Sequence, residues 1–468
     1  MKNHAPAFCP QSDEDVFVIE QDPRTIAYEV LDRVQNGAFA DLALDGALES
    51  LPGMDIRDRA LVTELVYGVL RYRGRLDYAL QQLCNKPLAK VESAVLNLLR
   101  LGGYQLLQLD RIPAHAAVFE TVELAKRLGL QRATGFINGI LRALVRQASQ
   151  LPWPKREAQP LAYLEHVLSL PHWLAKQWLS DFGPEQACDL AEAMLHPAPY
   201  FIRTNELKIQ RDTLLEILNN CECEAEPTPF APEGIRINQG VTRHLSGHAE
   251  GLFQLQDEAS MLISHLVDPQ PGDRILDTCA APGGKTTHMA ALADNQVQVI
   301  ALDLHPQRVE LIINGAARLG CQGIEGRAWD LTRAPNFLEP KSFDRILVDA
   351  PCSGLGVLRR NPEIRWRRKP GDLKQMAQLQ RTILHNVAPL LRPGGRLVYS
   401  LCTFSTEETD GVIRAFLSEH PDFERLDLRN EMPEGWRELL DNDGALRTLP
   451  HLHGGMDAFF AVAFQKRP

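Results

Sequence analysis

Two periodicities divide the chain into regions of different structure. Residues 22–150 repeat Leu, Val and Ala at three- and four-residue spacing, which keeps apolar side chains on one face of a helix. From Gly251 onward, short apolar runs rich in Val, Ile and Leu alternate with helical segments, a pattern typical of a parallel sheet with crossover helices. The sequence therefore predicts an all-α region followed by an α/β region.

The α/β region contains a regular series of predicted elements. Strands are predicted over Arg274–Asp277, Val297–Asp303, Ile324–Asp330, Phe343–Asp349 and Arg396–Cys402. Helices are predicted over Gly284–Ala293, Pro306–Leu319, Asp372–Leu391 and Glu407–Glu419. Ser405 and Glu408 have the spacing of a capping box for the last helix. A final apolar run, Ala458–Phe464, predicts a closing strand, which we expect to be antiparallel.

Prolines separate the predicted domains. A proline-rich linker at 151–160 follows the all-α domain at 22–150. A small α+β insert is predicted at 160–245, where short strands are broken by prolines, and a Rossmann-like α/β domain at 246–468. Residues 1–21 form an acidic lead-in. The insert is either an RNA-contacting module or a spacer, and its composition does not decide between the two.

The composition is that of a soluble globular protein with two or three domains. No apolar run approaches the ~20 residues of a membrane helix, and the first residues lack the apolar core of a signal peptide. The nine cysteines are scattered without a C-x-x-C pair. We therefore expect a cytoplasmic protein with reduced thiols and no metal site. The formal net charge of −10 argues against a protein that coats nucleic acid without specificity, but it permits a local basic surface.

A polar, bent segment follows the apolar run Ile346-Leu-Val348. It contains Asp349, a proline, Cys352 and a glycine, at the carboxyl end of a strand, where open α/β sheets bind their ligands. The basic run Arg359–Lys369 follows a few residues later and contains an indole. An acid and a thiol beside a cationic, aromatic segment indicate chemistry on a polyanion.

A glycine-containing turn joins the first predicted strand of this region to a helix, through Cys279, Ala280, Ala281, Pro282, Gly283, Gly284 and Lys285. Such a turn exposes backbone N–H groups to a ligand. The turn fails the P-loop pattern, because Cys279 stands where that pattern requires glycine. A nucleoside site is favoured instead, because Asp303 ends the next strand at about the ~20-residue offset of a ribose-binding acid. A single acid is commonly a helix cap or turn residue, but Asp303, Asp330 and Asp349 end three successive strands.

The missing G-x-G-x-x-G pattern counts against NAD and favours S-adenosylmethionine. Cys402 ends the fifth predicted strand, so we expect it to lie close to Cys352. A thiolate that adds to C6 of cytosine makes C5 reactive toward a methylsulfonium. An isolated cysteine is usually a small buried apolar residue, but two at adjacent strand ends favour catalysis. Chemistry alone does not decide which thiol is the nucleophile.

Three motifs in combination resemble the RNA cytosine-C5 methyltransferases. They are Cys279-Ala-Ala-Pro-Gly-Gly-Lys-Thr, Asp349-Ala-Pro-Cys-Ser-Gly-Leu-Gly and Tyr399-Ser-Leu-Cys-Thr. The helical region, with Pro113-Ala-His-Ala and Gly135-Phe-Ile-Asn-Gly-Ile-Leu-Arg, is similar to the NusB-type RNA-binding domain. Together these regions resemble the Sun/Fmu (RsmB-type) bacterial enzymes that act on 16S ribosomal RNA.

The resemblance implies S-adenosylmethionine at residues 279–285 and at Asp303, Asp330 and Asp349. It makes Cys402 the nucleophile, Cys352 the residue that assists product release, and Asp349 a contact to the cytosine. It implies a monomeric enzyme that methylates C5 of one cytosine in small-subunit rRNA. The target base must leave its stack, so the substrate is single-stranded or a loop.

The basic run is expected to hold the RNA. Its arginines would bind phosphates and its indole would offer a stacking platform; the residues are Arg359, Arg360, Arg365, Trp366, Arg367 and Arg368. Two other functions compete with this one. A non-catalytic RNA-binding or assembly factor would lack methyl transfer, and an RNA-stimulated NTPase would hydrolyse nucleotides.

Overall fold

The computed structural model describes residues 22–221, 223–239 and 247–468, so the predicted lead-in lies outside the described residues. The chain divides into two compact units. The first unit consists of Met1–Val69 and Ala79–Gln150, and the second of Leu70–Tyr78 and Leu151–Pro468. Among the described residues, none of the helices combines the length and the apolar character needed to cross a membrane.

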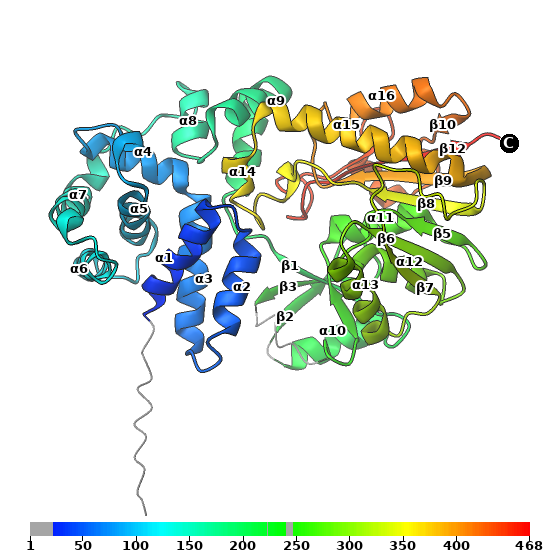
Figure 1. The fold of residues 1–468 in the computed structure, drawn as a ribbon, viewed down its shortest axis with the longest axis horizontal. Coiled ribbons are helices and arrows are strands. Elements are labelled where there is room, and N and C mark those ends of the chain that lie inside the picture. Colours follow the sequence, from blue (N-terminus) through cyan, green and yellow to red (C-terminus); the bar gives the residue numbers. More distant parts are fainter. Residues whose placement is uncertain (1–21, 222, 240–246) are drawn as a thin grey trace, which may run out of the picture. The chain divides into compact units, whose positions relative to one another are not determined.

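The N-terminal region is helical, as predicted (Figure 1). Its helices are α1 (Pro23–Gln35), α2 (Ala40–Glu49), α3 (Ile56–Arg71), α4 (Arg73–Leu83), α5 (Ser93–Gln108), α6 (Ala114–Arg127) and α7 (Thr134–Gln147). Asp22 caps α1 by accepting a hydrogen bond from the amide of Arg24. The pair Gly102-Gly103 lies inside α5. A Cβ on Gly102 would come within 2.7 Å of the Leu141 side chain, so glycine here permits close packing of α5 and α7.

A small antiparallel sheet precedes the C-terminal region. Helices α8 (Pro160–His166) and α9 (His172–Ala193) lead into it, and α10 (Arg211–Asn220) packs against it. Its strands, in the order β2-β3-β1-β4, are β1 (Tyr200–Thr204), β2 (Glu224–Pro227), β3 (Gly234–Gln239) and β4 (Phe253–Leu255). The apolar core between sheet and helix includes Ile202, Leu214 and Phe253. The predicted α+β insert is confirmed.

The C-terminal region is a mixed sheet with a parallel centre. Its strands run in the order β10-β12-β9-β8-β5-β6-β7, and β11 pairs with β12. They are β5 (Arg274–Asp277), β6 (Gln298–Asp303), β7 (Ile324–Ala328), β8 (Phe343–Asp349), β9 (Leu391–Leu401), β10 (Phe423–Arg425), β11 (Leu446–Arg447) and β12 (Phe460–Lys466). Strands β5 to β9 are parallel, and β12 is antiparallel to β9, as predicted.

Helices cover both faces of this sheet (Figure 1). On one face lie α15 (Pro370–Val387) and α16 (Asp410–Glu419), which bury Ile383 and Val412 with Ile346 of β8. The other face carries α11 (Glu258–Val267), α12 (Gly284–Leu292) and α13 (Pro306–Leu319). Alternate residues of one strand therefore enter different cores, since Leu347 packs on the α11 side. A short helix, α14 (Ile364–Arg367), lies within the basic run.

Two predicted boundaries at the site are wrong. The last strand before the nucleophile motif begins at Leu391 rather than Arg396, since a short helical turn ends α15 earlier than expected. Helix α16 begins at Asp410, so Ser405 and Glu408 do not cap it. Glu408 is instead fully buried and directs its carboxylate toward the loop after β8.

Candidate active site

A cavity of about 380 Å³ opens where the carboxyl ends of β5 and β8 meet. The predicted cofactor turn lines it through Cys279, Ala280, Ala281, Pro282, Gly284 and Lys285. Asp277 and Asp349 contribute the ends of the two strands. Other lining residues, among them Gln256 and Phe459, were not singled out from the sequence.

The backbone of the turn needs glycine at one position. Gly283 has a φ of 98°, in the left-handed region, and a Cβ there would lie 3.1 Å from the Cα of Ile312. Its amide donates to the carbonyl of Ala280 at 2.8 Å, which closes the turn before α12. The first amides of α12 therefore face the cavity, in an arrangement suited to a polar ligand.

Two of the predicted cofactor acids hold the protein's own groups. Asp303 is buried, and its Oδ2 accepts a hydrogen bond from the amide of Ala281 at 3.2 Å, so it supports the turn from behind. Asp330 lies two residues past the end of β7 and accepts hydrogen bonds from the amide and the hydroxyl of Thr332. These hydrogen bonds lower the pKa of Asp330. Neither acid lines the cavity, so their contact with a cofactor stays a prediction.

Asp349 joins the cofactor turn to β9. Its Oδ2 lies 2.7 Å from Nζ of Lys285, and its Oδ1 accepts a hydrogen bond from Ser400 at 2.7 Å. The Lys285 ammonium also lies over the ring of Phe459, 5.2 Å from its centroid. Asp349 thus lies between the cavity and the strand that leads to Cys402.

The two predicted cysteines lie together, as their strand positions indicated. Cys352 Sγ and Cys402 Sγ are 3.2 Å apart, and both side chains are partly buried. The hydrogen bond between the thiols, and then burial, raise the pKa of Cys352 well above its ordinary value. The raised pKa favours the protonated form of Cys352, and either thiol can be the donor in this contact.

A buried polar network holds the two cysteine loops. Glu408 Oε1 accepts from the Ser353 amide at 2.8 Å and from Gln380 Nε2 at 3.0 Å. The same Gln380 nitrogen donates to the carbonyl of Pro351, and the Tyr399 hydroxyl donates to Gln380 Oε1. The sequence analysis noted the spacing of Ser405 and Glu408 but interpreted it as a capping box for the last helix. In the structure, Glu408 instead belongs to this network.

Gly356 permits the closest approach of these loops. Its amide donates to the carbonyl of Cys402 at 2.9 Å, and its own carbonyl accepts from the amide of Ala458 at 3.1 Å. A Cβ at this position would overlap the Ala458 carbonyl oxygen and lie 2.8 Å from that of Cys402. Glycine is therefore required for the two segments to be in contact.

The prediction that the whole basic run grips RNA is wrong for two arginines. Arg359 and Arg365 are 4% and 0% exposed. Arg359 pairs with Asp457 at 2.8 Å. The guanidinium of Arg365 donates to four backbone carbonyls, those of Arg71, Ser169, Leu358 and Met194. Both side chains use their donors inside the protein because the run packs against the body of the second unit.

The other four predicted RNA contacts of the run, Arg360, Trp366, Arg367 and Arg368, are partly exposed. Arg360 lines the cavity and pairs with Asp257 and Asp457. Arg368 donates to the carbonyls of Ser353 and Cys352 at 2.9 and 3.2 Å, so it supports the loop that carries a candidate catalytic thiol.

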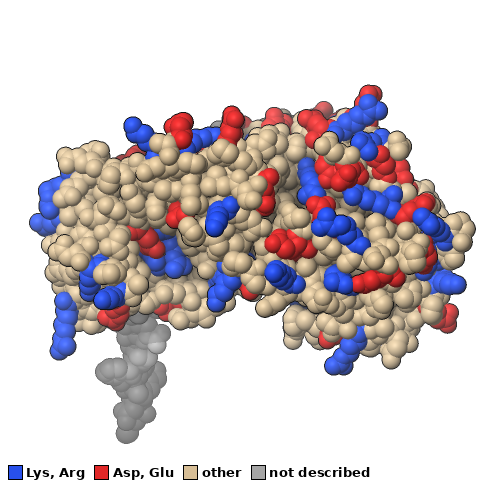
Figure 2. Space-filling model, turned by 90° about the horizontal axis from the view of Figure 1, so that it is seen from above, with Lys and Arg blue, Asp and Glu red and all other residues tan. Residues whose placement is uncertain are grey.

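Trp366 donates its indole N–H to the carbonyl of Leu70 and packs under the guanidinium of Arg73. RNA contact by Arg360, Trp366, Arg367 and Arg368 stays a prediction. Basic and acidic side chains are interspersed on the face that Figure 2 shows, so the net negative charge does not gather there in one patch.

A parallel sheet with a glycine turn after β5, continued beyond β9 by the antiparallel strand β12, is the fold of an S-adenosylmethionine-dependent methyltransferase. The family described as 16S rRNA methyltransferase RsmB/F matches residues 264–465. The NusB family matches residues 21–146, and the RsmF/B-like ferredoxin-like domain matches residues 170–244. The chain belongs to the 16S rRNA methyltransferase RsmB/F family, which confirms the predicted resemblance.

Individual relatives match over most of their length. The chain is 40% identical to a probable ribosomal RNA small subunit methyltransferase B of Bacillus subtilis, over 95% of this chain and 98% of that protein. It is 38% identical to ribosomal RNA small subunit methyltransferase B of Klebsiella pneumoniae, over 79% and 83% of the two chains. Among solved structures, that of PH0851 has a TM-score of 0.80 at 25% identity, and the match covers 95% of this chain and 99% of that one.

Proposed function

We propose that the protein methylates C5 of one cytosine in 16S rRNA through a covalent bond between Cys402 and C6 of the base. The observation that carries the proposal is the pair of sulfurs 3.2 Å apart, next to an acid that lines the cofactor cavity. A pyrimidine is not nucleophilic enough at C5 without addition at C6, and a thiolate is suited to that addition.

The residues that line the cavity suit S-adenosylmethionine, the methyl donor. Gly284 and Lys285, the first residues of α12, line the cavity, and the Lys285–Asp349 pair closes one side. When bound, S-adenosylmethionine supplies an electrophilic methyl group. Asp349 is held by Lys285 and Ser400 in a fixed direction, and we assign it the additional task of orienting the cytosine.

The steps on the base are then as follows. Cys402 attacks C6 as a thiolate, and the electron pair moved to C5 takes the methyl group. The proton on C5 leaves to a base, the C5–C6 double bond re-forms, and the bond between Cys402 and C6 breaks. The Cys352 thiol, which keeps its proton, donates a hydrogen bond to the departing sulfur and so assists release.

The N-terminal unit provides a surface for the RNA. A groove of about 630 Å³ between α6 and α7 is lined by four basic or imidazole side chains and by Phe119, which is 60% exposed. The four are His115, Lys126, Arg142 and Arg146. Cationic side chains beside an exposed ring suit phosphates and an unstacked base. We assign this groove to rRNA binding, with the enzyme acting as a monomer in the cytoplasm.

Two cysteine variants test the chemistry. Cys402→Ala should abolish methyl transfer to 16S rRNA and form no adduct. Cys352→Ala should accumulate protein bound covalently to RNA, seen as a denaturant-stable band on a gel. Cys221→Ala, which changes an exposed thiol outside the site, should behave as the unchanged protein. A stable adduct with Cys402→Ala would mean that Cys352 is the nucleophile and Cys402 assists release. If both variants are fully active and form no adduct, the mechanism is rejected.

Mapping of 5-methylcytosine in 16S rRNA with and without the protein tests the substrate. The expected result is one cytosine whose methylation depends on the protein and on S-adenosylmethionine. Binding to rRNA with no methyl transfer to any cytosine would instead indicate a non-catalytic assembly factor.

A further inference from the structure

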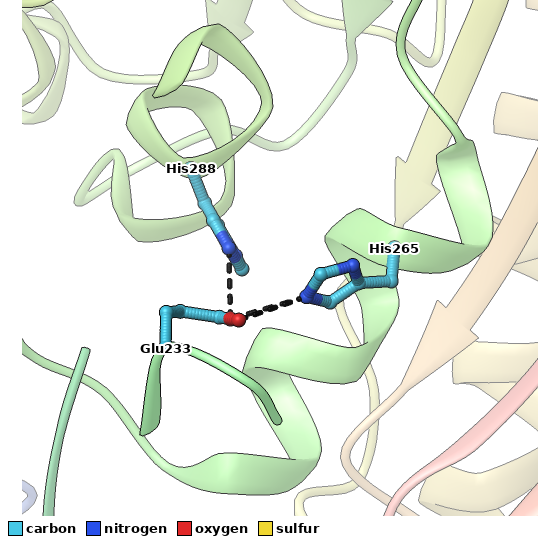
Figure 3. A group of neighbouring side chains, drawn as sticks. All are labelled: Glu233, His265 and His288. Carbon is cyan, nitrogen blue, oxygen red and sulfur yellow. Dashed lines mark hydrogen bonds and ion pairs between the residues drawn. The ribbon is translucent and has the colours of Figure 1, made fainter. Parts of the chain in front are cut away.

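A second cluster of polar side chains consists of Glu233, His265 and His288 (Figure 3). Glu233 stands directly before β3, His265 lies in α11 and His288 in α12. Nε2 of His265 lies 3.0 and 3.2 Å from the two carboxylate oxygens of Glu233, and Nε2 of His288 lies 2.9 Å from Oε1. Figure 3 shows both rings pointing at the same carboxylate, and one ligand atom from each residue lies within 4.8 Å of the others.

Burial makes this cluster unusual. Glu233 and His288 are 2% and 1% exposed, whereas the side chain of His265 keeps 22% of its surface in solvent. Neither ring nitrogen of His288 has an aligned hydrogen-bond partner among the described residues. Its Nε2 is directed at the Glu233 carboxylate at 2.9 Å, and its Nδ1 has no hydrogen-bond partner among the described residues.

A further acid lies near these three side chains. Glu258, which accepts hydrogen bonds from the amides of Phe230 and Ala231, adds a second buried carboxylate close by.

The spacing also suits a small divalent ion. Zinc binds imidazole nitrogen and carboxylate oxygen at about 2.0–2.2 Å, so neighbouring ligands of a tetrahedral site are about 3.3 Å apart. The contacts of 2.9 to 3.2 Å between Glu233 and the rings need only small movements to reach that value. Two imidazoles and one carboxylate with a position left open toward solvent form a recognised zinc ligand set.

We propose that Glu233, His265 and His288 bind one Zn²⁺ ion, with water as the fourth ligand on the exposed side of His265. The ion ties the start of β3 in the insert to α11 and α12, and α12 begins at the cofactor turn. It therefore has a structural task, which is to fix the insert against the helix whose first amides face the cavity. The sequence did not predict this site, because the ligands come from three separate elements and share no motif.

Metal content measures the proposal directly and without reference to catalysis. Full-length protein freed of any histidine tag is treated with a chelator, incubated with Zn²⁺, dialysed and analysed by mass spectrometry for metals. The expected result is about one zinc per chain, with visible ligand-field absorption when Co²⁺ replaces it. Zn²⁺ should also raise the melting temperature of the chelated protein, because it binds only the folded state.

Two variants and a matched control locate the ion. Glu233→Gln keeps the size of the side chain, and His265→Gln changes the partly exposed ligand; each should weaken zinc binding at least ~100-fold. The control is His420→Gln, in a more exposed group that also holds His385 and Glu419 and should not affect the zinc content. A folded protein that takes up no zinc overturns the proposal. So does zinc that is lost in His420→Gln and kept in Glu233→Gln, because the ion then belongs to the surface group.

Discussion

Glu408 accepts a hydrogen bond of 2.8 Å from the backbone amide of Ser353 and so connects the two loops that carry the cysteines. Ser353 directly follows Cys352, and its hydroxyl lies 2.8 Å from that of Thr403, which directly follows Cys402. All three contacting groups are fully buried. The separation of the two sulfurs is therefore set by neighbouring residues rather than by the flexible thiol side chains themselves.

Glu408→Gln should lower kcat. The substituted amide nitrogen faces donors, so one of the bonds from Ser353, Gln380 or Ser405 is lost and the cysteine loops shift. An unsatisfied buried group costs about 1–3 kcal/mol, so we expect about a tenfold loss of kcat or more and a lower melting temperature. Steady-state methylation kinetics and thermal unfolding measure the two effects. Glu419→Gln at the surface is the control, and an unchanged kcat for Glu408→Gln would contradict the role of the network.

Gly356→Ala should separate the loops more severely. The added methyl group would overlap the carbonyl of Ala458, so the segment after Cys352 must move away from Cys402. We expect the free energy of unfolding to fall by about 1–3 kcal/mol and methyl transfer to fall by at least ~100-fold. Gly371→Ala is the matched control, because a Cβ at Gly371 meets no atom within 4 Å. Equal activity of the two variants would show that the close contact has no catalytic role.

Much of the fold could be predicted from the hydrophobic pattern. Strands such as β5 and β8 are short apolar runs with turn residues after them, and α13 begins at a proline and ends before Gly320, whose φ is 75°. The pattern failed where tertiary contacts decide. Ser405 and Glu408 have the spacing of a capping box, yet α16 begins at Asp410 and Glu408 accepts a hydrogen bond from the amide of Ser353.

The candidate site could be predicted from the sequence only in part, because local motifs can be recognised in a sequence whereas long-range contacts cannot. Motifs around Cys279, Asp349 and Cys402 carry local signals, because a turn and a strand end can be recognised in the sequence itself. The network of Glu408 has only a partial signal, the spacing of Ser405 and Glu408, because its partners Ser353 and Gln380 lie 55 and 28 residues away in the chain. The basic run led to a wrong prediction of RNA contact for Arg365. A cluster of charged residues in the sequence does not reveal that this side chain is buried.

Arg365→Met tests that correction. The variant removes hydrogen bonds to four backbone carbonyls in the interior of the second unit. We expect the free energy of unfolding to fall by about 3 kcal/mol while the affinity of the folded protein for rRNA stays unchanged.

Arg146→Gln in the groove of the first unit should have the opposite effect. Loss of one phosphate contact lowers rRNA affinity and the salt dependence of binding, with little change in stability. Urea unfolding and filter binding at several salt concentrations measure both quantities. If Arg365→Met weakens RNA binding without loss of stability, the side chain leaves its buried position in the complex.

The raised pKa of Asp277 makes the free energy of unfolding depend on pH. Its Oδ2 accepts a hydrogen bond from Thr286 at 2.7 Å, whereas its Oδ1 is buried without a partner among the described residues. Burial is the largest cause that raises the pKa of this carboxyl from 3.8 to about 7. A raised carboxyl pKa means that the folded state holds the proton more tightly. The resulting stability is present in full below about pH 4 and is lost as the pH rises to about 7.

Asp277→Asn imitates the protonated carboxyl at every pH. The variant should therefore match the unchanged protein at pH 4 and exceed its free energy of unfolding at pH 8 by up to about 4 kcal/mol, the equivalent of the pKa shift. Asp257, whose pKa is also raised to about 7 by burial, affects both proteins equally, so their difference isolates Asp277. Urea unfolding at pH 4, 6 and 8 provides the comparison. A difference that is the same at all three values would mean that Asp277 stays ionised throughout, held by the ammonium of Lys285.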